Sequence, residues 1–70
     1  MRRKNLDFSN YRFTEAVAEF IHSKRDREML LRFYVDDATY DELCEEYNLS
    51  LSQVKRIIIG KGMIAFKHMN

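Results

Sequence analysis

Four hydrogen-bonding or cationic side chains, Ser52, Gln53, Lys55 and Arg56, lie close together in the sequence. No carboxylate accompanies them, since residues 51–70 contain four bases and no acid. At the start of a helix, such a set is typical of a surface that contacts base edges in the major groove of DNA. Arg56 can pair with guanine, Gln53 with adenine, and Ser52 with either kind of base. We therefore expect Ser52, Gln53 and Arg56 to be base-reading residues.

A second group of residues is expected to hold DNA phosphates. Lys55 supplies charge, while the hydroxyls of Thr39 and Ser50 stand at predicted helix starts, where free backbone N–H groups attract anions. The sequence also begins with a basic arm, residues 1–9, before the domain predicted for residues 10–70. Because flexible basic arms follow the DNA backbone or enter the minor groove, three further bases are expected at phosphates: Arg2, Arg3 and Lys4.

The elements that must position these residues are predicted to be helices, in a small all-α fold. Proline is absent, and the two glycines stand only at positions 60 and 62, so the main helix breakers are missing from most of the chain. Apolar residues recur at helical spacing in four segments. The expected helices span residues 10–22, 23–35, about 39–47, and from 50 onward.

The last two of these helices are expected to form a helix-turn-helix. Each begins with a capping box, made by Thr39 with Glu42 and by Ser50 with Gln53. Asn48 tolerates the left-handed backbone that ends a helix and would supply the turn. The second helix of such a motif is held out to enter the major groove. The residues expected to form the packed seam between the two helices are Leu43, Cys44, Tyr47, Leu49, Val54 and Ile57.

Composition limits the class of protein. Hydrophobic residues are 46% and charged residues 33% of the chain, a balance typical of a folded domain. The single cysteine, Cys44, fits a packed thiol in a reducing cytoplasm better than a disulfide scaffold. No apolar run suits a membrane span or a signal peptide. We expect a cytoplasmic protein without a membrane partner.

Charge is segregated along the chain although the net charge is only +1. Residues 36–50 contain six acids and no base, whereas the basic end that follows suggests an anionic partner. We expect the acids to oppose non-specific adhesion to DNA and to favour a helix start rather than to bind a metal. His22 and His68 lack further ligands at metal spacing. The sequence therefore predicts no enzyme activity, no cofactor and no metal.

Two stretches of the sequence resemble region four of bacterial RNA polymerase sigma factors. T-Y-D-E-L-C-E-E-Y-N-L-S-L-S-Q-V-K-R-I, residues 39–57, resembles its helix-turn-helix, and R-D-R-E-M-L-L-R-F-Y, residues 25–34, resembles the helix that leads into it. The resemblance implies binding to an upstream promoter element, docking on the flap of the polymerase β subunit, and a bacterial or phage origin. No other sigma region is recognised, which implies a stand-alone regulator or an accessory factor.

By position, the resemblance assigns the same roles as the chemistry does. Leu51 replaces a common basic residue of the family, and the family usually carries larger charged side chains at the contact positions. These differences imply a DNA target other than the family's familiar promoter sequence. The residues implied at bases are Ser52, Gln53 and Arg56, and those implied at phosphates are Thr39 and Lys55.

Two other interpretations of the polar residues on the last helix remain open from the sequence alone. They can be an ordinary solvated helix face. Alternatively, the chain is a protein-interaction module of the same fold that docks on RNA polymerase or another nucleic-acid enzyme, for instance as an inhibitor, without specific DNA binding.

The end of the last helix also has two interpretations. If the helix continues past Gly60 and Gly62, then Ile59, Met63 and Phe66 form an exposed apolar stripe that suits a homodimer or a polymerase contact. If the helix breaks at the glycines, these side chains fold back onto the first helix.

Overall fold

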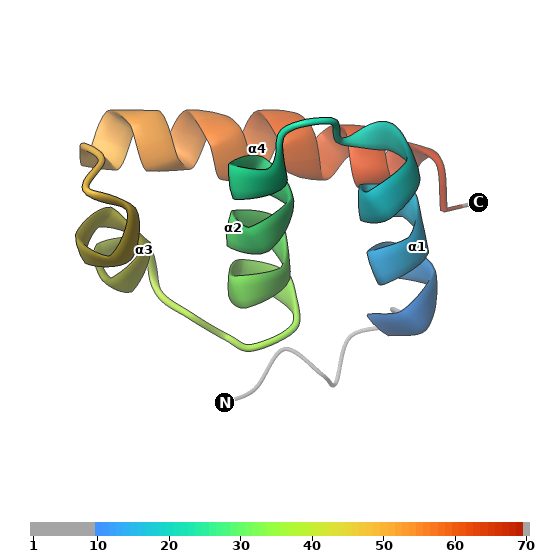
Figure 1. The fold of residues 1–70 in the computed structure, drawn as a ribbon, viewed down its shortest axis with the longest axis horizontal. Helices are drawn as coiled ribbons and strands as arrows, with labels where there is room; N and C mark the ends of the chain where they lie inside the picture. Colours follow the sequence, from blue (N-terminus) through green and yellow to red (C-terminus); the bar gives the residue numbers. More distant parts are fainter. Residues whose placement is uncertain (1–9, 70) are drawn as a thin grey trace.

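The computed structural model describes residues 10–69, which contain helices and no strand, so the predicted all-α class is confirmed (Figure 1). The predicted basic arm, with Arg2, Arg3 and Lys4, lies outside the described residues. The four helices are α1 (Asn10–Phe20), α2 (Lys24–Tyr34), α3 (Tyr40–Tyr47) and α4 (Leu51–Lys67).

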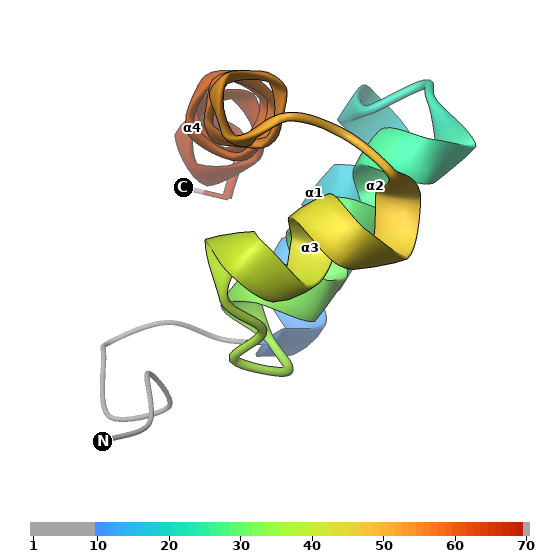
Figure 2. The same cartoon turned by 90° about the vertical axis from the view of Figure 1, so that its left-hand side faces the viewer.

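The longest helix, α4, lies across the other three (Figure 1). It packs against each of them, while α2 lies between α1 and α3 and packs against both. Figures 1 and 2 together show that α3 runs across the direction of α4. One face of α4 is therefore buried along its length, and its opposite face is left to solvent.

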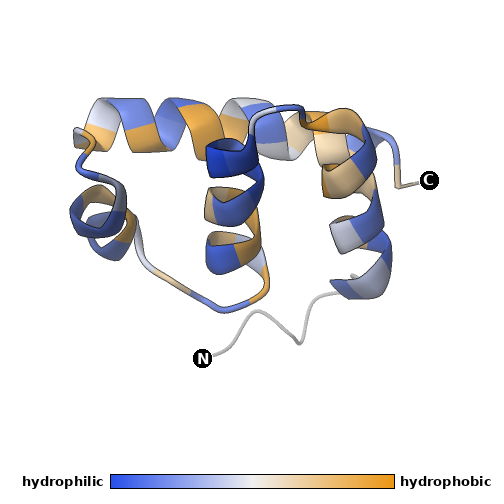
Figure 3. Cartoon of the chain, in the orientation of Figure 1, coloured by the Kyte–Doolittle hydropathy of each residue, from blue (hydrophilic) through white to orange (hydrophobic). Residues whose placement is uncertain are grey.

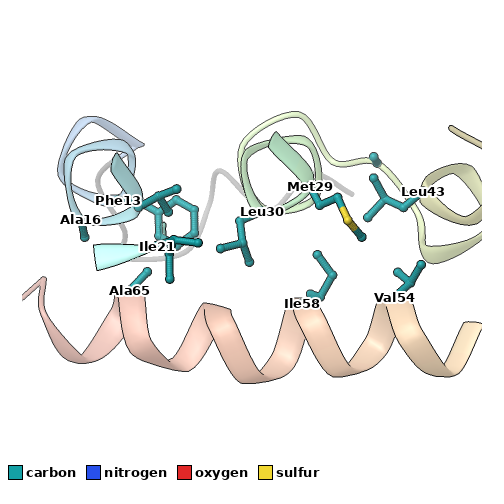
Figure 4. Close-up of a cluster of buried hydrophobic side chains, with 11 residues drawn as sticks. Phe13, Ala16, Ile21, Met29, Leu30, Leu43, Val54, Ile58 and Ala65 are labelled. Carbon is teal, nitrogen blue, oxygen red and sulfur yellow. The ribbon is translucent and has the colours of Figure 1, made fainter. Parts of the chain in front are cut away.

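The hydrophobic core lies between α4 and the three helices that it covers (Figure 4). Hydrophobic and hydrophilic residues alternate around the helices (Figure 3), which is the amphipathic pattern that such packing requires. From α4, Val54, Ile58 and Ala65 are fully buried, as their helical spacing predicts. The fully buried residues that face them from the other helices are Phe13, Val17, Met29, Leu30 and Leu43.

The predicted capping signals are confirmed at three helix starts. The Ser23 hydroxyl accepts a hydrogen bond from the Asp26 backbone N–H at 3.3 Å. Thr39 forms the full capping box that begins α3, and Ser50 the one that begins α4. Local hydrogen bonding therefore sets where these helices begin.

The first helix ends two residues before the predicted boundary at residue 22. The backbone carbonyls of Ile21 and His22 accept hydrogen bonds from Arg27 Nη1 at 2.9 and 3.0 Å. A side chain from α2 thus satisfies carbonyls at the end of α1, which lets the chain turn early.

Helix α4 continues through both glycines, so the interpretation in which it breaks there is wrong. A Cβ added at Gly60 would have no atom within 4 Å. Gly62 is buried, and a Cβ there would lie 2.8 Å from the hydroxyl of Tyr34. That hydroxyl donates a hydrogen bond to the Ile58 carbonyl at 3.2 Å. Gly62 thus leaves the space in which Tyr34 reaches the backbone of α4.

Phe66 does not lie on an exposed stripe, contrary to expectation. It is half-buried, and its ring centroid lies 5.1 Å from those of both Phe13 and Tyr34. The reason is that Phe66 follows buried Gly62 by about one helical turn, which brings it to the side where Tyr34 packs. Ile59 and Met63 are exposed as expected, at 51% and 67%.

Alanine at the two glycines is expected to change stability in opposite directions. Gly60→Ala should raise the free energy of unfolding by about 1 kcal/mol, because alanine is favoured over glycine in a helix and the methyl group meets no atom. Gly62→Ala should lower it, because the methyl group would displace Tyr34 from its hydrogen bond and from the rings around it. Denaturant unfolding of each variant measures the difference.

Tyr34→Phe provides the control for this pair. Phenylalanine lacks the hydroxyl that crowds position 62, so adding it to Gly62→Ala should recover part of the lost stability. If Gly62→Ala alone were as stable as Gly60→Ala, the close packing of Tyr34 on α4 would be wrong.

Candidate nucleic-acid interface

Helices α3 and α4 are joined by three residues, 48–50, and share a packed seam. Asn48 has the left-handed backbone predicted for it, with φ 56° and ψ 48°, and its N–H donates to the Cys44 carbonyl. Leu43 and Val54 are fully buried at the seam. The other predicted seam residues are half-buried and pack against the core: Cys44, Tyr47, Leu49 and Ile57. The seam holds the start of α4 with its outer side chains in solvent.

The four polar residues at the start of α4 are all exposed, but they are divided between two flanks of the helix. Gln53 and Arg56 line the same hollow. Lys55 is turned towards α3, where its Nζ lies 5.7 Å from the ring centroid of Tyr40. The structure therefore brings Gln53 and Arg56 together and holds Lys55 apart by a cation–π contact.

The side chain of Gln53 is already engaged in the capping box. Its Oε1 accepts hydrogen bonds from the backbone N–H of Ser50 at 3.1 Å and from the Ser50 hydroxyl at 3.2 Å. A bidentate contact with adenine uses the amide oxygen as an acceptor and the amide NH₂ as a donor. Gln53 would therefore have to share its oxygen with the cap or release the cap to make that contact.

The two capping hydroxyls stand in different electrostatic surroundings. Thr39 Oγ1 accepts from the Glu42 N–H at 3.1 Å, and the first turn of α3 carries Asp41 and Glu42. Ser50 Oγ accepts from the Gln53 N–H at 3.3 Å, and the first turn of α4 carries no acid. The positive end of the helix dipole is offset by carboxylates at Thr39 and not at Ser50. The charges around Ser50 are thus more favourable for binding a phosphate than those around Thr39.

The acids of α3 are exposed, and one of them ties α3 to α2. Glu46 forms an ion pair with Arg32, which also lies 3.8 Å from Asp36. The hydrogen bond with Arg32 lowers the pKa of Glu46 and raises the pKa of Arg32. Tyr47 donates to Glu28 at 3.4 Å, and burial together with the Glu28 charge raises the pKa of Tyr47. These contacts give Glu46, and Glu28 of α2, a structural role.

Within residues 10–69, no three His, Cys, Asp or Glu side chains form a group that could hold a metal ion. The ring of His68 stacks on that of Phe20, with centroids 3.8 Å apart. No helix in the same range is long and apolar enough to cross a membrane.

Sequence reasoning did not identify Arg25 or Ile64 as candidate residues. Arg25 lies at the start of α2, yet it lines the hollow that contains Gln53 and Arg56. No local pattern indicates this, because only the packing of α2 beside α4 brings the two arginines to one place. Ile64 is 38% exposed and extends the apolar surface of Ile59 and Met63, a position that its spacing from Gly60 could have shown once α4 was taken as unbroken.

Comparison of the chain with protein-family models, curated proteins and solved structures gave no match.

Proposed function

We propose that this chain is a sequence-specific DNA-binding regulator of transcription, or a sigma-like accessory factor, that works in the cytoplasm of a bacterium or in a phage-infected cell. In this proposal α3 and α4 are a helix-turn-helix, and the start of α4 enters the major groove. Ser52, Gln53 and Arg56 read bases, and Ser50, Thr39 and Lys55 contact phosphates. The protein needs no cofactor and catalyses no reaction.

The observation that carries the proposal is the state of Arg56. It is exposed beside Gln53 on a helix without acids, and it has no ion-pair or hydrogen-bond partner within residues 10–69. An exposed guanidinium that the protein itself does not use is available to guanine O6 and N7. The acids that would repel DNA lie on the neighbouring helix α3.

The geometry of the two helices supports the same proposal. A helix-turn-helix requires two helices that are joined by a tight turn, with one face of the second helix exposed to the DNA. Here the left-handed residue Asn48 forms the turn, and the seam of Leu43 and Val54 fixes the pair. The outer face of α4 is left in solvent.

Arg56→Ala is expected to weaken specific DNA binding by about 1–3 kcal/mol, because a bidentate base contact is worth roughly that much. Duplexes selected by the wild-type protein from a random DNA pool serve as the specific probe, and fluorescence anisotropy measures affinity at several salt concentrations. The matched control is Lys67→Ala, which removes the same charge from an exposed position in the last turn of α4.

Equal losses from Arg56→Ala and Lys67→Ala would mean that α4 acts only through its overall charge. Absence of any DNA binding by the wild-type protein at low salt would rule out the proposed function.

The second candidate, a protein-docking module, is favoured by one observation. Ile59, Met63 and Ile64 form an exposed apolar surface on the second half of α4, and Met63 and Ile64 also line an open hollow beside Gly60. An apolar surface without a partner suits a protein contact, either with RNA polymerase or in a homodimer. Sedimentation of the protein alone, and with purified RNA polymerase, distinguishes these two partners. Met63→Lys should abolish either association.

A further inference from the structure

From the packing of α2 beside α4, we infer that Arg25 forms a seat for one backbone phosphate of the bound DNA, beside the base-reading Arg56. The inference rests on the proposed DNA-binding function and adds a residue far from the helix-turn-helix in sequence. The hollow that would take the phosphate, here called the arginine hollow, is lined by Arg25, Leu49, Gln53, Arg56 and Ile57.

The arginine hollow is large enough to admit a phosphate group. Its volume is about 190 Å³, which is several times the ~30 Å³ that a water molecule occupies in the liquid. The half-buried side chains of Leu49 and Ile57 form the apolar part of its lining. The beginnings of α2 and α4 both lie in the upper part of the molecule in Figure 2, and Arg25 lines the same hollow as Gln53 and Arg56 of α4. Among the residues that line the hollow, only Arg25, Gln53 and Arg56 can bind an anion, and Arg25 is the one that is not assigned to a base.

A buried carboxylate holds Arg25 in place. Its Nε and Nη2 both donate to Asp26 Oδ1 at 3.2 Å. The Asp26 side chain is only 7% exposed, whereas that of Arg25 is 50% exposed. Asp26 is itself part of the capped start of α2, through Ser23. The guanidinium is therefore fixed on one edge, and its Nη1 has no partner within residues 10–69. A fixed guanidinium loses less conformational freedom on binding a phosphate than a mobile lysine does.

The charges at the arginine hollow favour an anion. Asp26 is the only carboxylate bonded to either arginine within the described residues, and it is matched by Arg25. Arg56 contributes a further positive charge that nothing in residues 10–69 neutralises. Gln53 lines the same hollow, so a base-reading residue and the phosphate seat would be adjacent.

The test replaces Arg25 by glutamine, which removes the charge while leaving an amide that can donate to Asp26. Lys24→Gln is the matched control, since Lys24 is the neighbouring residue of the same helix turn but lines a different hollow, between α1 and α2. Affinity is measured against salt concentration for the selected duplex and for a random-sequence duplex. Thermal melting confirms that each variant is folded.

Loss of one phosphate contact should make the slope of log K against log[salt] less steep by about 0.9. We expect this change for Arg25→Gln and not for Lys24→Gln. The affinity of Arg25→Gln should fall by the same factor on both duplexes, because a phosphate contact does not depend on the base sequence. Wild-type DNA binding with no change of slope in Arg25→Gln would overturn the phosphate seat while leaving the proposed function intact. Wild-type protein that binds no DNA would instead overturn the function itself.

A separate arm uses inorganic phosphate alone. Because free phosphate shares the chemistry of the DNA backbone, it should raise the melting temperature of the wild-type protein more than that of Arg25→Gln. Such a difference, together with a DNA salt slope that Arg25→Gln leaves unchanged, would identify a site for free phosphate and overturn the assignment to DNA.

Discussion

Leu43→Ala is expected to leave much of the protein unfolded at room temperature. Leu43 is fully buried, and its side chain is directed from α3 towards α4, beside Met29 and Val54 (Figure 4). Replacing a buried leucine by alanine costs about 2–5 kcal/mol, because it removes apolar contacts and leaves a cavity. A core of this size supplies only about 3–5 kcal/mol of stability. Circular dichroism and denaturant titration measure the loss.

Leu51→Ala is the control for that experiment. It makes the same chemical change at the first residue of α4, where the leucine is 45% exposed. An exposed substitution of this kind usually changes stability by less than about 0.5 kcal/mol. Similar losses from the two variants would show that Leu43 is not part of the seam between α3 and α4.

Gln53→Glu is expected to weaken the proposed specific DNA binding without loss of stability. A glutamate at this position can accept the same hydrogen bond from the Ser50 N–H, and its charge is favourable at the start of a helix by about 0.3–1 kcal/mol. On the DNA side, the carboxylate cannot donate to adenine N7 and is repelled by phosphates. The affinity should fall by at least the roughly 1–3 kcal/mol of one base contact.

Gln53→Ala separates the two roles of this residue. Alanine removes the capping interaction, so this variant should lose stability as well as affinity, whereas Gln53→Glu should lose affinity alone. Melting curves and anisotropy titrations on the same samples make the comparison. Retention of DNA affinity by Gln53→Glu would remove Gln53 from the proposed interface.

The helix starts could be predicted from the sequence because they depend on residues close together in the chain. The capping boxes at Thr39 and Ser50 each need partners only three positions apart, and the left-handed turn at Asn48 needs one suitable residue. The exposure of Gln53 and Arg56 follows from the same helical register that buries Val54 and Ile58. Local hydrogen bonds and periodicity were sufficient for these features.

The remaining features depend on contacts between distant segments. The path of α4 through Gly62 depends on Tyr34, whose ring and hydroxyl fill the space that a side chain would take. The same ring draws Phe66 inward. Arg25 reaches the candidate interface only because α2 packs beside α4. No spacing rule within one helix could indicate such neighbours.

The packing of α4 against each of the other three helices has a practical consequence. Each of α1, α2 and α3 loses core contacts if α4 detaches, so residues 10–69 should melt in a single cooperative transition. A molecule that binds the outer face of α4 should then raise the free energy of unfolding of the whole domain. The size of this increase is set by the concentration of the molecule and its dissociation constant. The melting temperature of the domain is thus a label-free measurement with which unknown ligands can be screened.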